Sequence, residues 1–224
     1  MYNQINKSLN SEQKTIAVIA NGQFPQKTKI IEQIKQSDMI IACDGAIKNL
    51  ANNHIIADYG IGDGDSTNDN QYNEWLKNPY IKIADQNCND LSKAINFIQQ
   101  QFGNEVNILI FAANGLREDH ALANIALFMQ YTDIFSQLAM ISDYGIFTVC
   151  HKGTTIVETM VGQQISFFSF DPNTNITCRE LKWQLVNQRL PYLNSGTLNQ
   201  AIADKLTICV DNSILLYRAF ETKN

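Results

Sequence analysis

The hydrophobic pattern up to residue 138 alternates between two kinds of segment. Short apolar runs rich in Ile and Val recur at residues 15–20, 39–43, 58–61, 80–84 and 106–112. Runs of this length are typical of strands that are buried on both faces. Between most of them lie segments with helical periodicity. The alternation predicts an α/β fold, with a mostly parallel sheet that carries helices on both faces.

Two of the helical segments show their apolar spacing clearly. In Asp90–Phe102 the apolar positions are Leu91, Ala94, Ile95, Ile98 and Phe102. A second helix is predicted to begin near Glu118, and its apolar face comprises Leu122, Ile125, Ala126 and Met129. Residues three and four positions apart share one face of a helix, so we expect the apolar face of each of these two helices to pack against the sheet.

Beyond residue 138 the helical pattern fades and short alternating runs take over, at residues 165–170, 181–185, 206–210 and 214–217. Turn-forming stretches separate them, such as Asp171-Pro172-Asn173 and Asn194-Ser195-Gly196. This pattern predicts an antiparallel β-sandwich. We therefore expect an α/β domain over residues 1–142 and a β-sandwich domain over residues 143–224.

Composition narrows the class of protein. Hydrophobic residues make up 45% of the chain and charged residues 17%, as in ordinary folded proteins. A formal net charge of -5, with no basic run, argues against nucleic acid or a membrane surface as a partner. No apolar run approaches the roughly 20 residues that span a bilayer. The 5 cysteines are widely spread without a CxxC pair, so we expect reduced thiols in a cytoplasmic, soluble protein.

The polar residues that follow the predicted strands carry the candidate chemistry. In chain order they are Asn21-Gly22, Asp44-Gly45, Gly62-Asp63-Gly64-Asp65-Ser66, Asp85 with Asp90, and Asn114-Gly115. The carboxyl ends of parallel strands meet at one edge of a sheet, where open α/β folds bind their ligands. The sequence therefore gathers several aspartates at one rim.

Crowded carboxylates repel one another unless a cation sits among them. Mg²⁺, held by a few carboxylates and by phosphate oxygens, fits this rim best. Asp63 and Asp65 are one glycine apart, and residues two apart in extended backbone point the same way, so both can reach one ion. Each aspartate also has a simpler reading: Asp44 as a turn residue, Asp85 as a solvated loop residue and Asp90 as a helix N-cap.

The segment Asn114-Gly115-Leu116-Arg117-Glu118-Asp119-His120 leads into the second predicted helix. Backbone N–H groups at a helix start favour anions, and Arg117 could donate a fork of hydrogen bonds to phosphate oxygens. Alternatively, Asp119 caps the helix while Arg117 makes a surface ion pair. The chain contains no GxxxxGK[ST], GxGxxG or GxSxG motif. From the residues alone we infer a metal-dependent phosphate site on an α/β rim.

Taken in order, these motifs resemble those of the thiamine pyrophosphokinase family. They are Asp44-Gly45, Gly62-Asp63-Gly64-Asp65-Ser66, Asp85-Gln86-Asn87-Cys88-Asn89-Asp90 and Gly115-Leu116-Arg117-Glu118-Asp119-His120. In the second half, Leu181-Lys182-Trp183 and Ser195-Gly196-Thr197-Leu198-Asn199-Gln200 occupy the places of two further family motifs. The resemblance runs from about Ile16 to the end of the chain.

The chain departs from the family's motifs at five positions. The family has an aromatic residue at Gly64, threonine at Asn89, glycine at Leu116 and at Glu180, and serine at Leu198. The aspartates and Arg117 are retained. The departures therefore affect the acceptor substrate more than the phosphoryl chemistry.

The resemblance implies an enzyme that transfers pyrophosphate from ATP to the hydroxyl of thiamine, giving thiamine diphosphate and AMP. It implies Mg²⁺ on Asp63, Asp65 and Asp90. Asp44 and Asp85 would complete the acidic shell, and Arg117 would offset phosphate charge. Further ligand contacts are assigned to Asn21, Gly22, Asp85, Asp119, Trp183 and Asn199. The sequence does not identify a general base; Asp44 and Asp65 are candidates, and a carboxylate that holds the metal could also serve.

The resemblance also implies a homodimer whose interface forms the thiamine site, with Trp183 close to thiamine. On alternation alone Trp183 is equally a core residue of the sandwich, with its ring facing opposite to Lys182 and Gln184. Two other functions remain open: a pyrophosphokinase of the same fold that acts on another alcohol, such as a hydroxymethyl pterin, and a catalytically silent nucleotide- or thiamine-binding protein.

Overall fold

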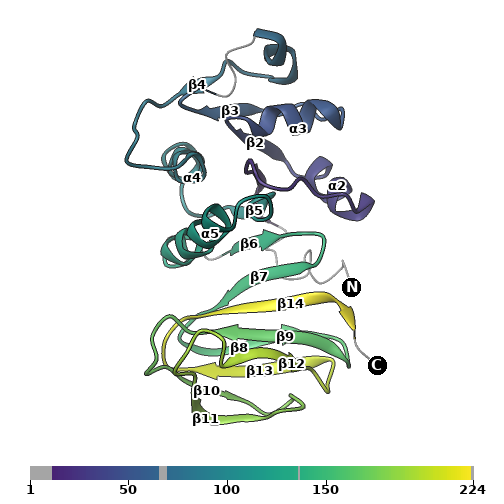
Figure 1. Ribbon diagram of the computed structural model, residues 1–224, viewed down its shortest axis with the longest axis vertical. Coiled ribbons are helices and arrows are strands. Elements are labelled where there is room, and N and C mark those ends of the chain that lie inside the picture. Colours follow the sequence, from purple (N-terminus) through teal and green to yellow (C-terminus); the bar gives the residue numbers. More distant parts are fainter. Residues whose placement is uncertain (1–11, 66–69, 136, 223–224) are drawn as a thin grey trace. The chain divides into compact units, whose positions relative to one another are not determined.

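The computed structural model describes residues 12–65, 70–135 and 137–222 (Figure 1). Ser66 of the predicted metal-binding motif lies outside these ranges. The chain divides into two compact units, one that ends at Asp143 and one that begins at Tyr144.

A parallel sheet forms the centre of the N-terminal unit. Its strands are β1 (Thr15–Ile19), β2 (Met39–Cys43), β3 (Tyr59–Gly62), β4 (Ile81–Lys82), β5 (Asn107–Phe111) and β6 (Gln137–Ile141). They pair in the order β6-β5-β1-β2-β3-β4, and each of these pairings is parallel. The chain runs outward from β1 to β4 and then returns to the other side of β1 as β5. The carboxyl ends of β1 and β5 therefore form the topological switch point of the sheet.

Helices cover both faces of this sheet, as the sequence predicts. Figure 1 shows α2 (Thr28–Lys35) and α3 (Ala46–Asn52) on one face, with α4 (Asp90–Phe102) and α5 (Glu118–Tyr131) on the other. A short 3-10 helix, η1 (Asn70–Trp75), precedes β4. The predicted apolar positions Leu91, Ala94, Ile95 and Ile98 of α4 are all buried. Among the described residues, no helix has the length and apolar composition needed to cross a bilayer.

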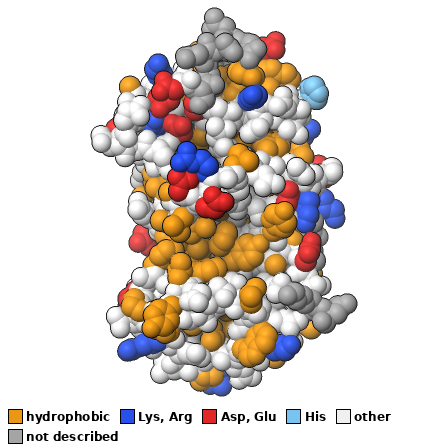
Figure 2. All heavy atoms as spheres, in the orientation of Figure 1, with side chains coloured by type: hydrophobic (Ala, Val, Ile, Leu, Met, Phe, Trp, Pro, Cys, Tyr) orange, Lys and Arg blue, Asp and Glu red, His pale blue; other side chains and the backbone are white. Residues whose placement is uncertain are grey.

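The apolar face predicted for α5 is wrong. The buried side chains of this helix are Phe128 and Tyr131, whereas Leu122 and Ala126 are exposed and Ile125 and Met129 are only partly covered. Figure 2 shows apolar side chains gathered on the face of the molecule that carries α5. Apolar residues lie on most sides of α5, so spacing alone does not identify the side that packs against the sheet.

The C-terminal unit is an antiparallel β-sandwich, as predicted. Its strands are β7 (Gly145–Cys150), β8 (Gly153–Glu158), β9 (Gln163–Phe168), β10 (Asn175–Cys178), β11 (Leu185–Arg189), β12 (Gly196–Gln200), β13 (Lys205–Val210) and β14 (Ile214–Thr222). One layer pairs in the order β12-β9-β14-β7 and the other in the order β11-β10-β13-β8. Alternate residues of β13, namely Leu206, Ile208 and Val210, are buried in the core of the unit.

Candidate active site

The loops after β1 and β5 are tied together at the switch point of the N-terminal sheet. Gly22 donates its backbone N–H to the carbonyl of Ala112 over 2.7 Å, and Gln23 donates to that of Asn114 over 2.9 Å. A Cβ atom on Gly22 would lie 2.5 Å from the Ala112 oxygen, so the close approach of the loops requires glycine. Asn21 is exposed, and its Nδ2 lies 2.6 Å from where a Cβ on Gly45 would be.

A cavity of about 590 Å³ opens at this edge of the sheet, within the range of ligand pockets. The sequence-predicted residues that line it are Asn21, Gly22, Asp63, Asp90 and Arg117, and Lys93 and His120 also contribute. Asp44, Asp65, Asp85 and Asp119 are not among the lining residues. The predicted rim therefore exists, but only part of the predicted set faces the cavity.

Asp44 is fixed beneath the rim. It is 3% exposed, and its Oδ1 accepts a hydrogen bond of 2.7 Å from the hydroxyl of Tyr80. Its backbone φ of 29° lies in the left-handed region, which aspartate tolerates better than most residues. A Cβ on Gly62 would lie 2.6 Å from Asp44 Cβ, so glycine lets β3 approach this residue. These contacts hold Asp44 in one position.

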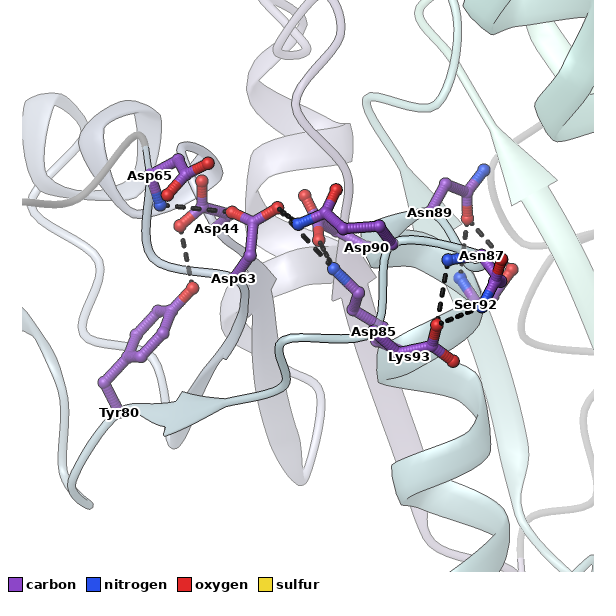
Figure 3. A network of polar contacts seen from close by, with 11 residues as sticks. Asp44, Asp63, Asp65, Tyr80, Asp85, Asn87, Asn89, Asp90, Ser92 and Lys93 are labelled. Carbon is purple, nitrogen blue, oxygen red and sulfur yellow. Dashed lines mark hydrogen bonds and ion pairs between the residues drawn. The ribbon is translucent and has the colours of Figure 1, made fainter.

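Asp63 and Asp65 do not point the same way along extended backbone, because Gly64 turns the chain with a φ of 81°. The Oδ1 of Asp63 accepts a hydrogen bond of 3.1 Å from the backbone N–H of Asp65, and this bond is the main cause that lowers the pKa of Asp63. Figure 3 shows Asp65 on the Asp44 side of Asp63, with Lys93 on the other side. The carboxylate of Asp65 is exposed.

Asp90 is the first residue of α4, but it does not cap the helix. The cap is Asn89, whose Oδ1 accepts a hydrogen bond of 2.9 Å from the backbone N–H of Ser92. The reading of Asp90 as an N-cap is therefore wrong. Because Asn89 satisfies the helix end, the Asp90 carboxylate is available to face the cavity, which it lines.

Lys93 is a site residue that the sequence analysis missed. Its Nζ donates to Asp90 Oδ1 over 2.9 Å and lies 3.8 Å from Asp63 Oδ2 (Figure 3). Burial acts to lower the pKa of Lys93, but the hydrogen bond to Asp90 and the surrounding carboxylates raise it overall. The sequence did contain a signal: a lysine one turn after Asp90 within the buried part of an amphipathic helix, where lysine needs a charged partner.

Asp85 is turned toward its own loop. Its Oδ1 accepts hydrogen bonds from the backbone N–H of Asn87 over 2.8 Å and from Asn87 Nδ2 over 3.0 Å. The backbone hydrogen bond is the main cause that lowers the pKa of Asp85. Asp85 thus shapes the loop that leads to Asn89 and Asp90.

Arg117 and Asp119 form a two-point ion pair at the start of α5. Arg117 Nε donates to Asp119 Oδ1 over 3.1 Å, and Nη2 donates to Oδ2 over 2.6 Å. The hydrogen bond from Arg117 lowers the pKa of Asp119 to about 2. Arg117 is at the N-cap position without a side-chain cap, and Asp119 instead accepts from the backbone N–H of His120 over 2.9 Å. Both partners are exposed, so the pair contributes little to stability.

Leu116, just before this pair, has a φ of 64° and is 76% exposed. A left-handed backbone conformation is unfavourable for leucine and natural for the glycine that the family carries there. Leu198 in the C-terminal unit repeats the combination, with a φ of 60° and 67% exposure. Two of the departures from the family's motifs are therefore strained, exposed leucines.

Trp183 is not a core residue, so that reading is wrong. It is 57% exposed, and Lys182 Nζ lies 5.1 Å from the centre of its ring. Residues 182–184 are not part of a strand, and all three are exposed. Asn199 holds this segment, because its Oδ1 accepts from Trp183 N over 3.2 Å and its Nδ2 donates to Trp183 O over 2.7 Å. Residues 182–184 therefore form a loop that hydrogen bonds to the side chain of Asn199 hold in place, although the alternating pattern of residues 181–185 predicts a strand.

In the described part of the chain, no group of three or more His, Cys, Asp or Glu side chains is close enough to hold a metal ion by itself. Two carboxylates do converge, because Asp63 and Asp90 share the ammonium of Lys93. Mg²⁺ commonly uses one or two carboxylates and takes its other ligands from phosphate and water. The donor set at this edge therefore fits a magnesium ion that binds together with a phosphate ligand.

Two family models match the chain. Residues 31–141 match the model described as thiamin pyrophosphokinase, catalytic domain, and residues 145–217 match thiamin pyrophosphokinase, substrate-binding domain. A comparison with curated proteins found no match.

Solved structures share the fold along most of the chain. A thiamin pyrophosphokinase family protein from Enterococcus faecalis superposes with a TM-score of 0.79 at 21% identity, covering 93% of this chain and 100% of that one. Thiamin pyrophosphokinase from Candida albicans gives 0.79 at 15% identity, with 94% and 90% covered. Thiamine pyrophosphokinase from Bacillus subtilis gives 0.75 at 21% identity, with 94% and 100% covered.

Proposed function

Because the chain belongs to the thiamin pyrophosphokinase family, we propose that it transfers the pyrophosphate group of ATP to the hydroxyl of thiamine, which gives thiamine diphosphate and AMP. The observation that carries this proposal is the cavity at the switch point of the N-terminal sheet. It brings the carboxylates of Asp63 and Asp90 together with the cations of Lys93 and Arg117. Such a mixture suits a polyphosphate that binds with a metal ion.

Asp63 and Asp90, with Asp65 as a further ligand, would hold Mg²⁺ in company with phosphate oxygens. When bound there, Mg²⁺ would neutralise charge on the phosphates and fix their orientation. Asp44 lies beneath these residues, and its buried, hydrogen-bonded carboxylate adds negative charge to the same edge of the sheet. Asp85 acts through the loop that it orders next to Asn87.

The oxygen of the acceptor hydroxyl would form a bond to the β-phosphorus of ATP, and the bond from that phosphorus to the oxygen bridging the α-phosphate would break. AMP leaves with the bridging oxygen, and the hydroxyl proton passes to the carboxylate cluster, with Asp44 and Asp65 as candidate acceptors. Arg117, which lines the cavity, would donate to phosphate oxygens. Most of the rate enhancement would come from positioning and charge neutralisation.

The acceptor would bind to the C-terminal unit, where the exposed ring of Trp183 offers a face for the cationic thiazolium or the pyrimidine. We further propose a homodimer whose interface completes this site. The exposed apolar residues of α5, among them Leu122 at 63% exposure, support an interface. The cytoplasm is the proposed location, since it supplies ATP and keeps the free cysteines reduced.

A single assay tests the reaction. Protein, ATP, Mg²⁺ and thiamine are incubated, and nucleotides and thiamine esters are separated by chromatography. AMP and thiamine diphosphate should appear in equal amounts, only with thiamine present, and EDTA should abolish both. ADP or inorganic phosphate as the main product would overturn pyrophosphoryl transfer.

Leu198 supports a second candidate function, because a strained, exposed leucine occupies the place where the family has serine. The candidate is a pyrophosphokinase that acts on another alcohol. Replacing thiamine with a hydroxymethyl pterin in the same assay separates the two. Formation of AMP with the pterin but not with thiamine would support the second candidate. If the protein binds ATP but forms AMP with neither acceptor, it is the catalytically silent binding protein.

A further inference from the structure

Lys93 lies at the point where the two carboxylates of the cavity converge. Its side chain is 3% exposed, compared with 22% for Asp63 and 34% for Asp90. The nitrogen contacts Asp90 Oδ1 at 2.9 Å and Asp63 Oδ2 at 3.8 Å, as Figure 3 shows. The ammonium is therefore the least exposed charge of these three, and it connects α4 to the loop that follows β3.

The ion pairs of Lys93 with Asp63 and Asp90 are not needed to form α4. Asn89 already caps α4 through Ser92, and Leu91, Ala94 and Ile95 already bury the helix against the sheet. A buried lysine is unfavourable unless it is paired. What Lys93 does in the structure is neutralise two carboxylates that would otherwise repel each other.

The two oxygens nearest to Lys93 Nζ are Asp90 Oδ1 and Asp63 Oδ2, and Asp63 Oδ2 also accepts a hydrogen bond of 3.4 Å from Gln86 Nε2. Asp63 Oδ1 is directed elsewhere, to the backbone N–H of Asp65. A divalent ion that binds both Asp63 Oδ2 and Asp90 Oδ1 would compete with the ammonium of Lys93 for these oxygens and would be repelled by it at short range.

We propose that Lys93 is an internal cation that occupies the metal position in the metal-free protein and is displaced when the divalent ion binds, after which its ammonium binds phosphate oxygens of the nucleotide. Only one part of this proposal rests on the proposed function, namely that the phosphate ligand is a nucleotide. It implies that metal and nucleotide favour each other's binding, since the nucleotide gives the displaced ammonium a new partner.

The first test compares Lys93→Met with Lys82→Met. Lys82 is the matched control, because it is exposed and its Nζ lies 3.8 Å from where a Cβ on Gly64 would be, next to the same loop. Each protein is titrated with Mn²⁺ without nucleotide, and free Mn²⁺ is followed by electron paramagnetic resonance at low and high salt.

Lys93→Met should bind Mn²⁺ about tenfold more tightly than the wild type at both salt concentrations, because a competing buried charge is gone. Lys82→Met should change the affinity by less than about threefold, and salt should remove that change. Equal effects of the two variants, or weaker Mn²⁺ binding by Lys93→Met, would overturn the proposal.

A second measurement uses the wild-type protein and does not depend on how the variant folds. Lysines are acetylated briefly and quantified by mass spectrometry, with Lys82 as the internal reference. Mn²⁺ alone should raise the reactivity of Lys93 severalfold, and a non-hydrolysable ATP analogue with Mg²⁺ should lower it again. Lys93 reactivity that Mn²⁺ leaves unchanged would overturn displacement. Neither Mn²⁺ experiment contains an acceptor, so a failure to form AMP would refute the proposed function without deciding the role of Lys93.

Discussion

Side chains at the carboxyl edge of the N-terminal sheet are held by partners, whereas those of the candidate acceptor region in the C-terminal unit extend into solvent. Asp44 is 3% exposed and bonded to Tyr80, and Asp63 and Asp90 share Lys93. Trp183 and Leu198, by contrast, are 57% and 67% exposed. The backbone of Trp183 is fixed through Asn199, and its exposed ring has Lys182 Nζ 5.1 Å from its centre.

The proposed function accounts for this difference. A polyphosphate with a metal ion requires charges at fixed positions, and fixed charges need hydrogen-bond partners to hold them. An exposed aromatic ring gains binding energy only when a ligand or another chain covers it. Under the proposed function, the phosphate site would be largely formed within one chain, and the acceptor site is the region where a second chain would contribute most.

The largest effect is expected at the prepared edge. If Asp90 holds the metal ion as proposed, Asp90→Asn should lower kcat by about 100-fold or more, because one of the charges that would hold the metal and phosphates is lost. The melting temperature should stay close to that of the wild type, because Asn89 still caps the helix and the amide oxygen introduced at position 90 can still accept a hydrogen bond from Lys93. Steady-state kinetics and thermal unfolding measure the two quantities.

Asn89→Ala is the matched control for that prediction. It should lower stability by about 1 kcal/mol through loss of the bond to Ser92, while Asp90 keeps its carboxylate. If Asp90→Asn instead destabilises the protein as much as Asn89→Ala does, the Asp90 carboxylate has a structural role. The contrast between a binding edge in the N-terminal unit and an exposed acceptor region in the C-terminal unit then disappears.

On the solvent-exposed side, Trp183→Ala should raise the KM for thiamine about 2- to 30-fold, which corresponds to the roughly 0.5–2 kcal/mol of a cation–π contact. The KM for ATP and the melting temperature should hardly change, because the ring is exposed in the single chain. Steady-state kinetics, with the concentration of each substrate varied in turn, measure the two KM values separately. Equal increases in both KM values, together with a large loss of stability, would mean that the ring supports the fold.

A smaller effect is expected at Leu116. Leu116→Gly should stabilise the protein by about 1 kcal/mol, because leucine at a φ of 64° is strained and glycine is not. Leu116→Ala is the control, since it removes the side chain but keeps a Cβ and therefore the strain. Urea denaturation measures both variants. A gain that alanine reproduces would assign the effect to the exposed side chain and not to the backbone.

The smallest effect concerns pH. The pKa of Asp119 is lowered from 3.8 to about 2 by Arg117, so the stabilising pair is fully present above pH 3.8 and is lost as the pH falls toward about 2. The stability difference between the wild type and Asp119→Asn should be small at neutral pH and should vanish over that window. Urea denaturation from pH 5 to pH 2 checks this, and a difference that persists at pH 2 would contradict the assigned cause.

Much of the fold followed from local pattern. Apolar runs separated by amphipathic helices require a parallel sheet, and the carboxyl ends of its strands must share one edge, so Asp44, Asp63 and Asp90 could be placed together before the structure was known. The alternating runs of the C-terminal half likewise required a two-layered antiparallel arrangement. In both halves the inference needs only which residues are apolar and how far apart they lie.

Only the tertiary structure decided how these side chains are partnered. Lys93 of α4 pairs with Asp63 in the loop after β3, and α5 buries Phe128 in place of the predicted face. Sequence spacing reports neighbours along one element, whereas these outcomes depend on atoms brought together from distant elements. The sequence by itself therefore determined which residues reach the rim, and the packing of elements determined which of them face the cavity and which charge lies between them.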